Sequence, residues 1–351
     1  MTKKPSISKV FFLPWEARNR LTELLQQSGA ENTVQRGDLT ALKMHFGEQG
    51  TEGYIRPEYL RPIIQMVHNQ KGKPFLTDTG TIYLGHRTHA VEHLELALQH
   101  GFSQNRLQVP IIIADGLRGC DFREVKIDGT YFKKVNIASA IYEASSMLVL
   151  SHFKGHVLAG FGGAIKNLGM GCSARKDKFA MHSNVAPELT PKLCTTCGEC
   201  IKHCAQKALS FVDRKIHLDK EKCAGCGECI IVCKYRVFAI SWNEGSKSVQ
   251  ERFVEYALGA IKEKRTFYLN FLNFITPDCD CINQGEKPII PDIGIMASSD
   301  PVAIDQASLD IVIEKAGDIF KKAHPHTDGN VQLEYAEKLG LGSRKYKLLG
   351  L

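Results

Sequence analysis

Eight cysteines give this sequence its clearest chemistry. The first run is Cys194, Cys197, Cys200 and Cys204, and the second is Cys223, Cys226, Cys229 and Cys233. Both runs have the spacing C-x₂-C-x₂-C-x₃-C, which suits thiolates that wrap an iron–sulfur cubane. Zinc sites instead use two C-x₂-C pairs, without a third cysteine crowded beside each pair. The spacing therefore predicts two [4Fe–4S] clusters, and a pair of zinc ribbons is the alternative.

Residues 186–242 resemble the bacterial-type two-cluster ferredoxins, and both runs contain C-x-x-C-G-E-C. In that family the fourth cysteine of each run ligates the other cluster. The resemblance implies one cluster on Cys194, Cys197, Cys200 and Cys233, and a second on Cys223, Cys226, Cys229 and Cys204. This sequence departs from the family at Ala205 and Lys234, where a proline usually follows the fourth cysteine. Segments 208–219 and 237–242 are expected to form short flanking strands.

A glycine-rich stretch, SHFKGHVLAGFGGAIKNLGMGC, occupies residues 151–172. It fits neither a Walker A loop nor a dinucleotide-binding fingerprint, because Ile165 stands where each would need glycine. The stretch follows a predicted strand, and ligands in open α/β sheets bind beyond the carboxyl ends of strands. We therefore expect a site that includes His152, His156, Lys166 and Asn167. The alternative is that the glycines serve tight packing and the histidines are ordinary surface groups.

Further polar residues lie where loops or helix starts are predicted. Asp78 and Arg87 follow another predicted strand and suit an anionic substrate, with capping and surface pairing as the alternative. Asp305 lies near the start of a helix that Asp300 is expected to cap, so a capping role competes with catalysis. Cys172 is expected to meet Cys279 and Cys281 as a redox pair or third metal site, or else to be incidental. His89 and His93 have a spacing that permits metal binding but is more often that of surface residues.

Three stretches resemble the family numbered 362 among the domains of unknown function, whose members are often called Fe–S center proteins. They are HFKGH…GFGGAIKNLGMGC, DTGTIYLGHRTHA (78–90) and SSDPVAIDQAS (298–308). Together with the cysteine segment they span nearly the whole chain. The resemblance names a family without naming a reaction.

Residues 156–166, HVLAGFGGAIK, are also similar to the H-x-x-A-G-F-S-G-x-x-K stretch of the lactate racemases. In those nickel-pincer enzymes the lysine carries the cofactor covalently and the histidine is catalytic. The similarity implies an anchoring role for Lys166 and an acid–base role for His156. Gly162 stands where the racemases have serine, and His182 is the nearest candidate for a nickel-binding histidine.

The rest of the chain alternates strand-like and helix-like segments. Examples are the strand-like 8–13, 73–80 and 147–153 and the helix-like 57–72 and 248–263. Such alternation implies crossover connections. We predict an α/β body with a largely parallel mixed sheet and an inserted small α+β ferredoxin-like two-cluster domain. The predicted boundaries are 1–185 for the first part of the body, 186–242 for the insert and 243–351 for the second part.

The composition indicates the cellular compartment of the protein and the class of partner it binds. The 351 residues contain 12 cysteines, and we find neither a signal peptide nor an apolar run long enough to span a membrane. We therefore expect a soluble cytoplasmic protein whose cysteines bind metal. The formal charge of +7 comes from scattered basic residues, so we expect no nucleic-acid partner.

These observations favour an iron–sulfur, electron-transfer function. The first hypothesis is a ferredoxin-type oxidoreductase that passes electrons from the two clusters to a site in the α/β body. There, His152, His156, Lys166 and Asn167 would act on a small anionic or polar substrate held by Asp78, Arg87, Cys172 and Asp305. The second is an electron carrier or maturation factor that docks on a redox partner protein. The third is a racemase-like isomerase with a lysine-anchored metal cofactor. Substrate, direction of electron flow and oligomeric state stay open.

Overall fold

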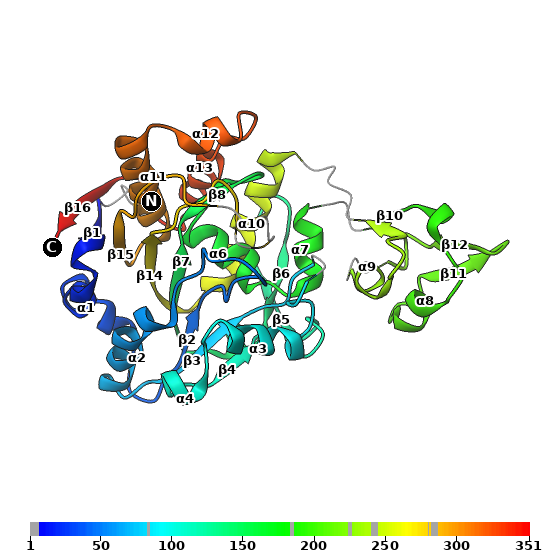
Figure 1. Cartoon of the computed structure of the whole chain (residues 1–351), viewed down its shortest axis with the longest axis horizontal. Coiled ribbons are helices and arrows are strands. Elements are labelled where there is room, and N and C mark those ends of the chain that lie inside the picture. Colours follow the sequence, from blue (N-terminus) through cyan, green and yellow to red (C-terminus); the bar gives the residue numbers. More distant parts are fainter. Residues whose placement is uncertain are drawn as a thin grey trace.

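The computed structural model describes residues 7–82, 85–182, 186–223, 227–239, 245–279, 281 and 287–351. Its centre is an eight-stranded sheet in the order β16-β1-β15-β14-β7-β2-β3-β4 (Figure 1). The strands are β1 (Ser8–Pro14), β2 (Leu39–Lys43), β3 (Lys73–Asp78), β4 (Ile111–Ile113), β7 (Ser146–His152), β14 (Arg265–Leu272), β15 (Gly294–Ser298) and β16 (Tyr346–Gly350).

The sheet is mostly parallel. Strands β4, β3, β2, β7 and β14 run parallel to one another, whereas β15 lies antiparallel to both β14 and β1. All residues of β7 are buried, as expected for a central parallel strand covered on both faces. The predicted α/β body with a largely parallel mixed sheet is confirmed.

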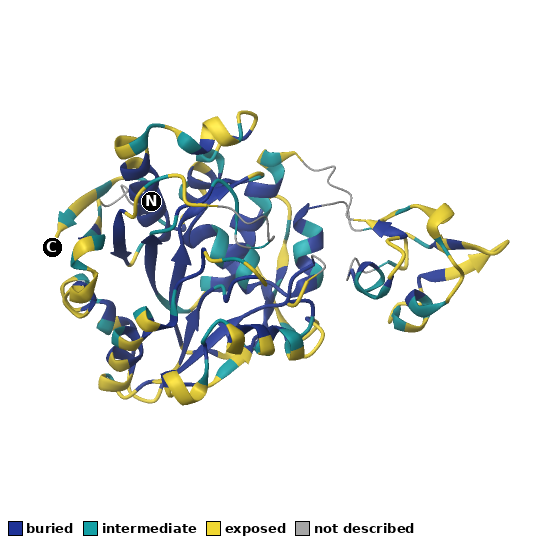
Figure 2. Ribbon diagram, viewed as in Figure 1, coloured by how far each residue is buried: buried dark blue, intermediate teal, exposed yellow. Residues whose placement is uncertain are grey.

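Helices cover both faces, and the buried sheet separates two cores (Figure 2). Side chains alternate across β7, so Met147 and Val149 enter the first core while Leu148 and Leu150 enter the second. The second core lies against α1 (Leu21–Ser28), α2 (Leu60–Asn69), α3 (Ala90–Gln99) and α4 (Gln104–Leu107). The first lies against α5 (Ser139–Glu143), α6 (Ala164–Cys172), α10 (Ser246–Ile261), α11 (Pro301–Ala316), α12 (Ile319–Ala323) and α13 (Asn330–Lys338).

Short 3₁₀ turns and hairpins complete the body. The 3₁₀ turns are η1 (Trp15–Arg20), η2 (Ala30–Thr33) and η3 (Pro57–Tyr59), and the hairpins are β5 (Phe122–Lys126) with β6 (Lys134–Ala138) and β8 (Lys154–His156) with β9 (Gly160–Gly162). As predicted, Asp300 caps α11, accepting hydrogen bonds from the backbone N–H groups of Val302 and Ala303. The described part of the chain contains no helix of the length and apolarity that a membrane crossing demands.

Residues 186–239 form a small unit with its own core, between α7 (Arg175–His182) and α10 in the chain (Figure 1). Its elements are β10 (Glu188–Leu189), η4 (Pro191–Leu193), α8 (Glu199–His203), β11 (Leu209–Val212), β12 (Lys215–Leu218), α9 (Glu228–Val232) and β13 (Phe238–Ala239). Strand β11 pairs antiparallel with β12, and β10 with β13. Helices α8 and α9 each follow a glycine with a left-handed backbone, Gly198 (φ 76°) and Gly227 (φ 71°). The same turn thus precedes both helices, and its positive φ favours glycine.

Candidate functional site

A pocket opens where three neighbouring parallel strands end. Lys43, Asp78 and His152 are the last residues of β2, β3 and β7, and each lines the pocket. The rest of the wall comes from the hairpin β8–β9, helices α6 and α7, and loop residues such as His45, Arg87 and Cys281. The empty volume is about 810 Å³, part of it open to solvent. The site thus lies at the carboxyl edge of the sheet, where ligands of open α/β folds bind.

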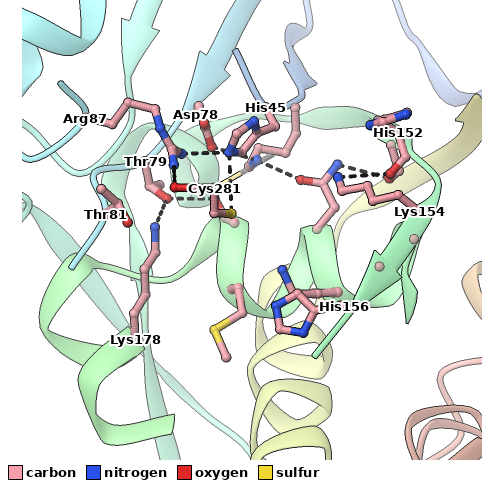
Figure 3. Close-up of a pocket in the computed structure, with 18 of the residues that line it drawn as sticks. His45, Asp78, Thr79, Thr81, Arg87, His152, Lys154, His156, Lys178 and Cys281 are labelled. Carbon is pink, nitrogen blue, oxygen red and sulfur yellow. Dashed lines mark hydrogen bonds and ion pairs between the residues drawn. The ribbon is translucent and has the colours of Figure 1, made fainter. Parts of the chain in front are cut away.

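Six of the residues singled out in the sequence line this pocket: Asp78, Arg87, His152, His156, Lys166 and Asn167. Residues far apart in sequence therefore converge on one cavity (Figure 3). The glycine-rich stretch forms the hairpin β8–β9 followed by α6, where a loop was expected before the helix. The hairpin carries Lys154 and His156 to the pocket, and α6 carries Lys166 and Asn167.

Cys172 and Asp305 lie outside the pocket lining. Cys172 is fully buried at the end of α6, where burial raises the pKa of its thiol to about 11. Asp305 accepts hydrogen bonds from the backbone N–H groups of Ala164 (2.7 Å) and Ile165 (2.9 Å) at the start of α6. Cys172 and Asp305 were expected to bind substrate, but Cys172 lies buried at the end of α6 and Asp305 lies against the N-terminus of the same helix.

Close packing at the start of α6 explains one glycine of the motif. A Cβ on Gly163 would lie 2.3 Å from Oδ1 of Asp305. Burial raises the pKa of Asp305 to about 6, and Asn270 also donates to its Oδ1 at 2.8 Å. Gly163 therefore allows a carboxylate to hold the N-terminus of α6 from behind, which positions Lys166 and Asn167.

Lys43 was missed by the sequence analysis. Its Nζ donates to Oδ1 of Asp78 at 3.0 Å and to Oδ1 of Asn167 at 2.8 Å, and the side chain is only 1% exposed. Burial opposes ionisation of Asp78, but the charge of Lys43 keeps the pKa of Asp78 below its usual value. Asn167 in turn donates to the carbonyl of Leu150 and to the hydroxyl of Ser151. A single lysine therefore ties β3 to α6 across the floor of the pocket.

The two predicted histidines have fixed roles in hydrogen bonding. Nδ1 of His156 accepts the backbone N–H groups of Leu158 and Ala159, both at 3.1 Å. The proton of the neutral ring consequently resides on Nε2. Burial, and then the charge of Lys166, lowers the pKa of His156 well below its usual value, so the ring is neutral. Nε2 of His152 lies 2.8 Å from the carbonyl oxygen of Asn273, which anchors the end of β7.

Positive charge dominates the described lining. Five lysine and arginine side chains face one carboxylate, that of Asp78; they are Lys43, Arg87, Lys154, Lys166 and Lys178. Lys154 donates to the carbonyl of His152 at 3.1 Å, and Lys178 donates to Oγ1 of Thr79 at 2.6 Å. Burial lowers the pKa of Lys178 to about 8. The pocket is therefore suited to an anion, since buried cations need a counter-charge.

Arg87 occupies one end of the pocket together with His45 and Cys281 (Figure 3). Its Nε lies 3.0 Å from Oε2 of Glu48, and its Nη1 lies 2.7 Å from Nε2 of His45. Burial opposes the charge of Arg87, but Cys281 and Glu48 beside it keep its pKa above the usual value. Cys281, which the sequence analysis grouped with Cys172 and Cys279, lines the pocket without them, whereas His45 was missed because strand and helix patterns do not encode its contacts across the fold.

The two histidines with helical spacing do not share a site. His89 is exposed and pairs with Glu92, whereas His93 is fully buried with Nε2 3.6 Å from Oδ2 of Asp78. Burial lowers the pKa of His93 to about 3, so His93 lies neutral behind the pocket wall. His89 thus lies at the surface, as the alternative expected, whereas His93 is buried and faces Asp78.

The described cysteines of the small unit line two cavities, and each cavity is lined by cysteines of both runs; we call these groups crossed sets. Cys194, Cys197, Cys200 and Cys233 line one cavity, with an empty volume of about 300 Å³. Cys204, Cys223 and Cys229 line the other, with about 390 Å³. Cys226 lies outside the described residues. In each cavity the last cysteine of one run meets cysteines of the other run, so the donor sets match the ligand sets implied by the ferredoxin resemblance.

Helix α7 touches both the pocket and the small unit. Lys178 and His182 line the pocket, while Phe179, one residue away from Lys178, is fully buried in the core of the small unit. Arg175 at the start of α7 donates to the carbonyl of Thr88 at 2.8 Å and forms an ion pair with Glu228 of α9. One short helix therefore connects the cysteine cavities with the substrate-sized pocket.

Comparison with known proteins places the chain in a family. The model of the family described as "Domain of unknown function (DUF362)" matches residues 40–310, and the chain belongs to this family. No protein with a curated description matches it.

Two solved structures are similar at low identity. The lactate racemase apoprotein from Thermoanaerobacterium thermosaccharolyticum has a TM-score of 0.45 and 12% identity, over 88% of this chain and 58% of that one. A protein from Thermotoga maritima has a TM-score of 0.42 and 11% identity, over 87% of this chain and 59% of that one. The chain thus spans less than two thirds of the length of either.

Proposed function

We propose that this member of the family is an iron–sulfur oxidoreductase that binds a small anionic substrate in the pocket of the α/β body. The electrons would come from two [4Fe–4S] clusters held by the small unit. The observation that carries the proposal is the surplus of positive charge in the pocket lining at the carboxyl edge of the sheet, where five cationic side chains, three of them buried, face one carboxylate. A protein that only carried electrons would not need such a pocket.

The cationic side chains divide into two groups with different tasks. Lys43 and Arg87 pair with Asp78 and Glu48, so their charges are largely balanced within the protein. Lys154 and Lys166 lie on the β8–β9 hairpin and on α6, and they face the same cavity. They are the groups that bind a carboxylate or phosphate of the substrate. Nε2–H of His156 is a neutral donor that orients a polar oxygen of the same molecule.

The crossed cysteine sets support the cluster assignment. Four of the eight cysteines line one cavity, and three of the other four line the second. Each cluster, when bound, stores and passes single electrons at a potential that hydrogen bonds and exposure set. The protein contributes two similar turns that present thiolates to each cavity, and helix α7 holds the unit beside the pocket.

A second candidate function is favoured by the surroundings of Lys166. The charge of Lys166 lowers the pKa of both His156 and His182, after the larger effect of burial, and all three residues line the pocket. These are the residues that the racemase resemblance singled out. The alternative is an isomerase in which Lys166 anchors a metal cofactor and a histidine moves the proton.

Anaerobic reduction separates these functions. The purified protein is reduced chemically, and cluster absorbance is followed while small carboxylates and phosphate esters are added. The oxidoreductase predicts about eight irons per chain and reoxidation that is lost in Lys166→Ala with the iron content unchanged. Reoxidation only by another protein would support a carrier, and a covalent mass adduct on Lys166 would support the isomerase. Zinc, or about four irons per chain, would overturn the two-cluster assignment.

A further inference from the structure

Cys281 is a pocket residue with no part in the function proposed above. It is partly exposed, lines the same cavity as Lys166 and lies with its Sγ 3.7 Å from Nε2 of His45. Nη2 of Arg87 donates to its carbonyl oxygen at 3.3 Å, which holds its backbone against the guanidinium. His45 therefore contacts the sulfur, Arg87 holds the backbone of Cys281, and Lys166 lines the same pocket.

Nε2 of His45 is the side-chain nitrogen that lies beside the sulfur of Cys281. The guanidinium of Arg87 can only donate, and its Nη1 lies 2.7 Å from the same Nε2, so this nitrogen accepts a hydrogen bond from Arg87. Burial, and then the charge of Arg87, lowers the pKa of His45. The sulfur of Cys281 therefore lies beside an imidazole that a guanidinium holds in place, in a pocket rich in cationic side chains.

The neighbouring cysteine supplies a further donor. The thiol of Cys279 donates to the sulfur of Cys281, which lowers the pKa of Cys281 well below its usual value despite burial. The charge of Lys166 acts in the same direction. The thiolate form is the nucleophilic form of cysteine, and positively charged surroundings are its usual cause.

The other cysteines outside the two runs lack this combination. Cys172 is fully buried, and burial raises the pKa of its thiol to about 11. Cys120 is exposed on the surface, away from the pocket lining, with its thiol donating to the carbonyl of Arg118. Cys279 is the donor of the pair, and its hydrogen bond to Cys281 raises its pKa. Cys281 alone of these four lines the pocket.

We propose that Cys281 is a catalytic nucleophile of the pocket, and that the substrate is an aldehyde or ketone that also carries a carboxylate or phosphate. The inference rests on the anion-binding part of the proposed function, because Lys154 and Lys166 hold the negative group. The sulfur forms a bond to the carbonyl carbon, and the π electrons of the C=O bond move to the oxygen. The ammonium of Lys166 gives that oxygen a proton and becomes a neutral amine, while Lys154 keeps the negative group. The adduct is a hemithioacetal with a neutral hydroxyl, and the carboxylate or phosphate of the substrate is unchanged. The step is redox-neutral and needs no further reactant.

Alkylation of the intact protein tests the nucleophile. Holoprotein is treated anaerobically with iodoacetamide at about pH 6 and about pH 8, and each cysteine is quantified by peptide mass spectrometry. A thiolate that is already formed reacts at nearly the same rate at both values, whereas an ordinary thiol gains roughly tenfold per pH unit. We expect Cys281 to react at about pH 6 more than about tenfold faster than the exposed Cys120, and His45→Gln to reduce this advantage.

A carbonyl probe tests the substrate class. Glyoxylate carries an aldehyde and a carboxylate, whereas acetate is a matched anion without the carbonyl. Glyoxylate is expected to protect Cys281 from iodoacetamide reversibly and acetate to protect it much less. Lys166→Met should weaken the protection, while Cys281→Ser should remove the label and leave the iron content unchanged.

Two results would overturn the inference. One is Cys281 reacting with the same rate and pH dependence as Cys120, and the other is equal protection by acetate and glyoxylate. The proposed function fails separately. A reactive Cys281 in a protein without two clusters would refute the oxidoreductase alone, and an inert Cys281 with Lys166-dependent reoxidation would refute the nucleophile alone.

Discussion

Lys43 and Asp78, the last residues of two adjacent parallel strands, form an almost fully buried ion pair of 3.0 Å in the floor of the pocket. Removal of one partner leaves the other charged and buried, which typically costs about 3–5 kcal/mol. Lys43→Met should therefore lower the free energy of unfolding by about that amount, measured by urea denaturation at neutral pH. Lys133→Met, at a lysine 75% exposed, is the matched control and should change little.

The same pair predicts a pH dependence. The pKa of Asp78 is lowered in the folded state, so its stabilising contribution is fully present above the unfolded pKa of about 4 and is lost progressively as pH falls below it toward the lowered folded pKa. The wild type should lose stability below about pH 4 more steeply than Asp78→Asn, in which this titration is absent. Parallel curves for the two proteins would contradict the assignment of the titration to Asp78.

Lys178 should make anion binding sensitive to alkaline pH. Burial lowers its pKa to about 8, so its charge is present below this value and disappears above it. We expect sulfate, whose charge is constant in this range, to bind more weakly as pH rises through about 8 when measured by calorimetry. Lys178→Arg, whose guanidinium stays charged, should abolish this dependence. If Lys178→Arg keeps the same alkaline loss, another group is responsible.

Glu228 contacts two arginines of the body, and these provide a paired test of the link through α7. Arg175 is 2% exposed in its ion pair with Glu228, whereas Arg118 is 59% exposed and lies 3.0 Å from the same carboxylate. Arg175→Met should lower the free energy of unfolding by about 3 kcal/mol, and Arg118→Met by less than about 1 kcal/mol. Similar losses in the two variants would show that burial of Arg175 does not decide the strength of the pair.

The crossed cysteine cavities predict which variants share a defect. Cys233 lines the cavity of Cys197 although it belongs to the run of Cys229. We expect electron paramagnetic resonance spectra of reduced Cys233→Ser to match those of Cys197→Ser and to differ from those of Cys229→Ser. Each variant should lose the signal of one cluster and keep that of the other. Spectra in which Cys233→Ser resembles Cys229→Ser would mean that each run binds its own cluster.

The sheet could be predicted because its signals are local. Apolar runs such as 147–153 alternate with helical patterns, and this alternation predicts crossovers and parallel strands regardless of distant contacts. The candidate residues His156 and Lys166 could likewise be chosen from one glycine-rich stretch. Lys43 and Asp305 were harder, because their roles depend on partners 124 and 141 residues away, Asn167 and Ala164. Lys43 ends a buried strand and was not predicted as part of a site. Asp305 was predicted to bind substrate or to cap a helix, but its partners at the start of α6 could not be foreseen.

The chain leaves the body through α7 and returns through α10, and these two helices are joined by direct hydrogen bonds. Tyr256 donates to Oδ1 of Asp177 at 2.7 Å, and Arg252 donates to the carbonyl of Ala180 at 2.8 Å. The ends of the excursion are therefore already adjacent, as in domains that tolerate insertion at a surface loop. A short glycine–serine bridge between the two helices would excise the cysteine-bearing module while keeping the sheet continuous. The trimmed protein would be colourless and insensitive to air, a scaffold in which ligand chemistry is measured on its own.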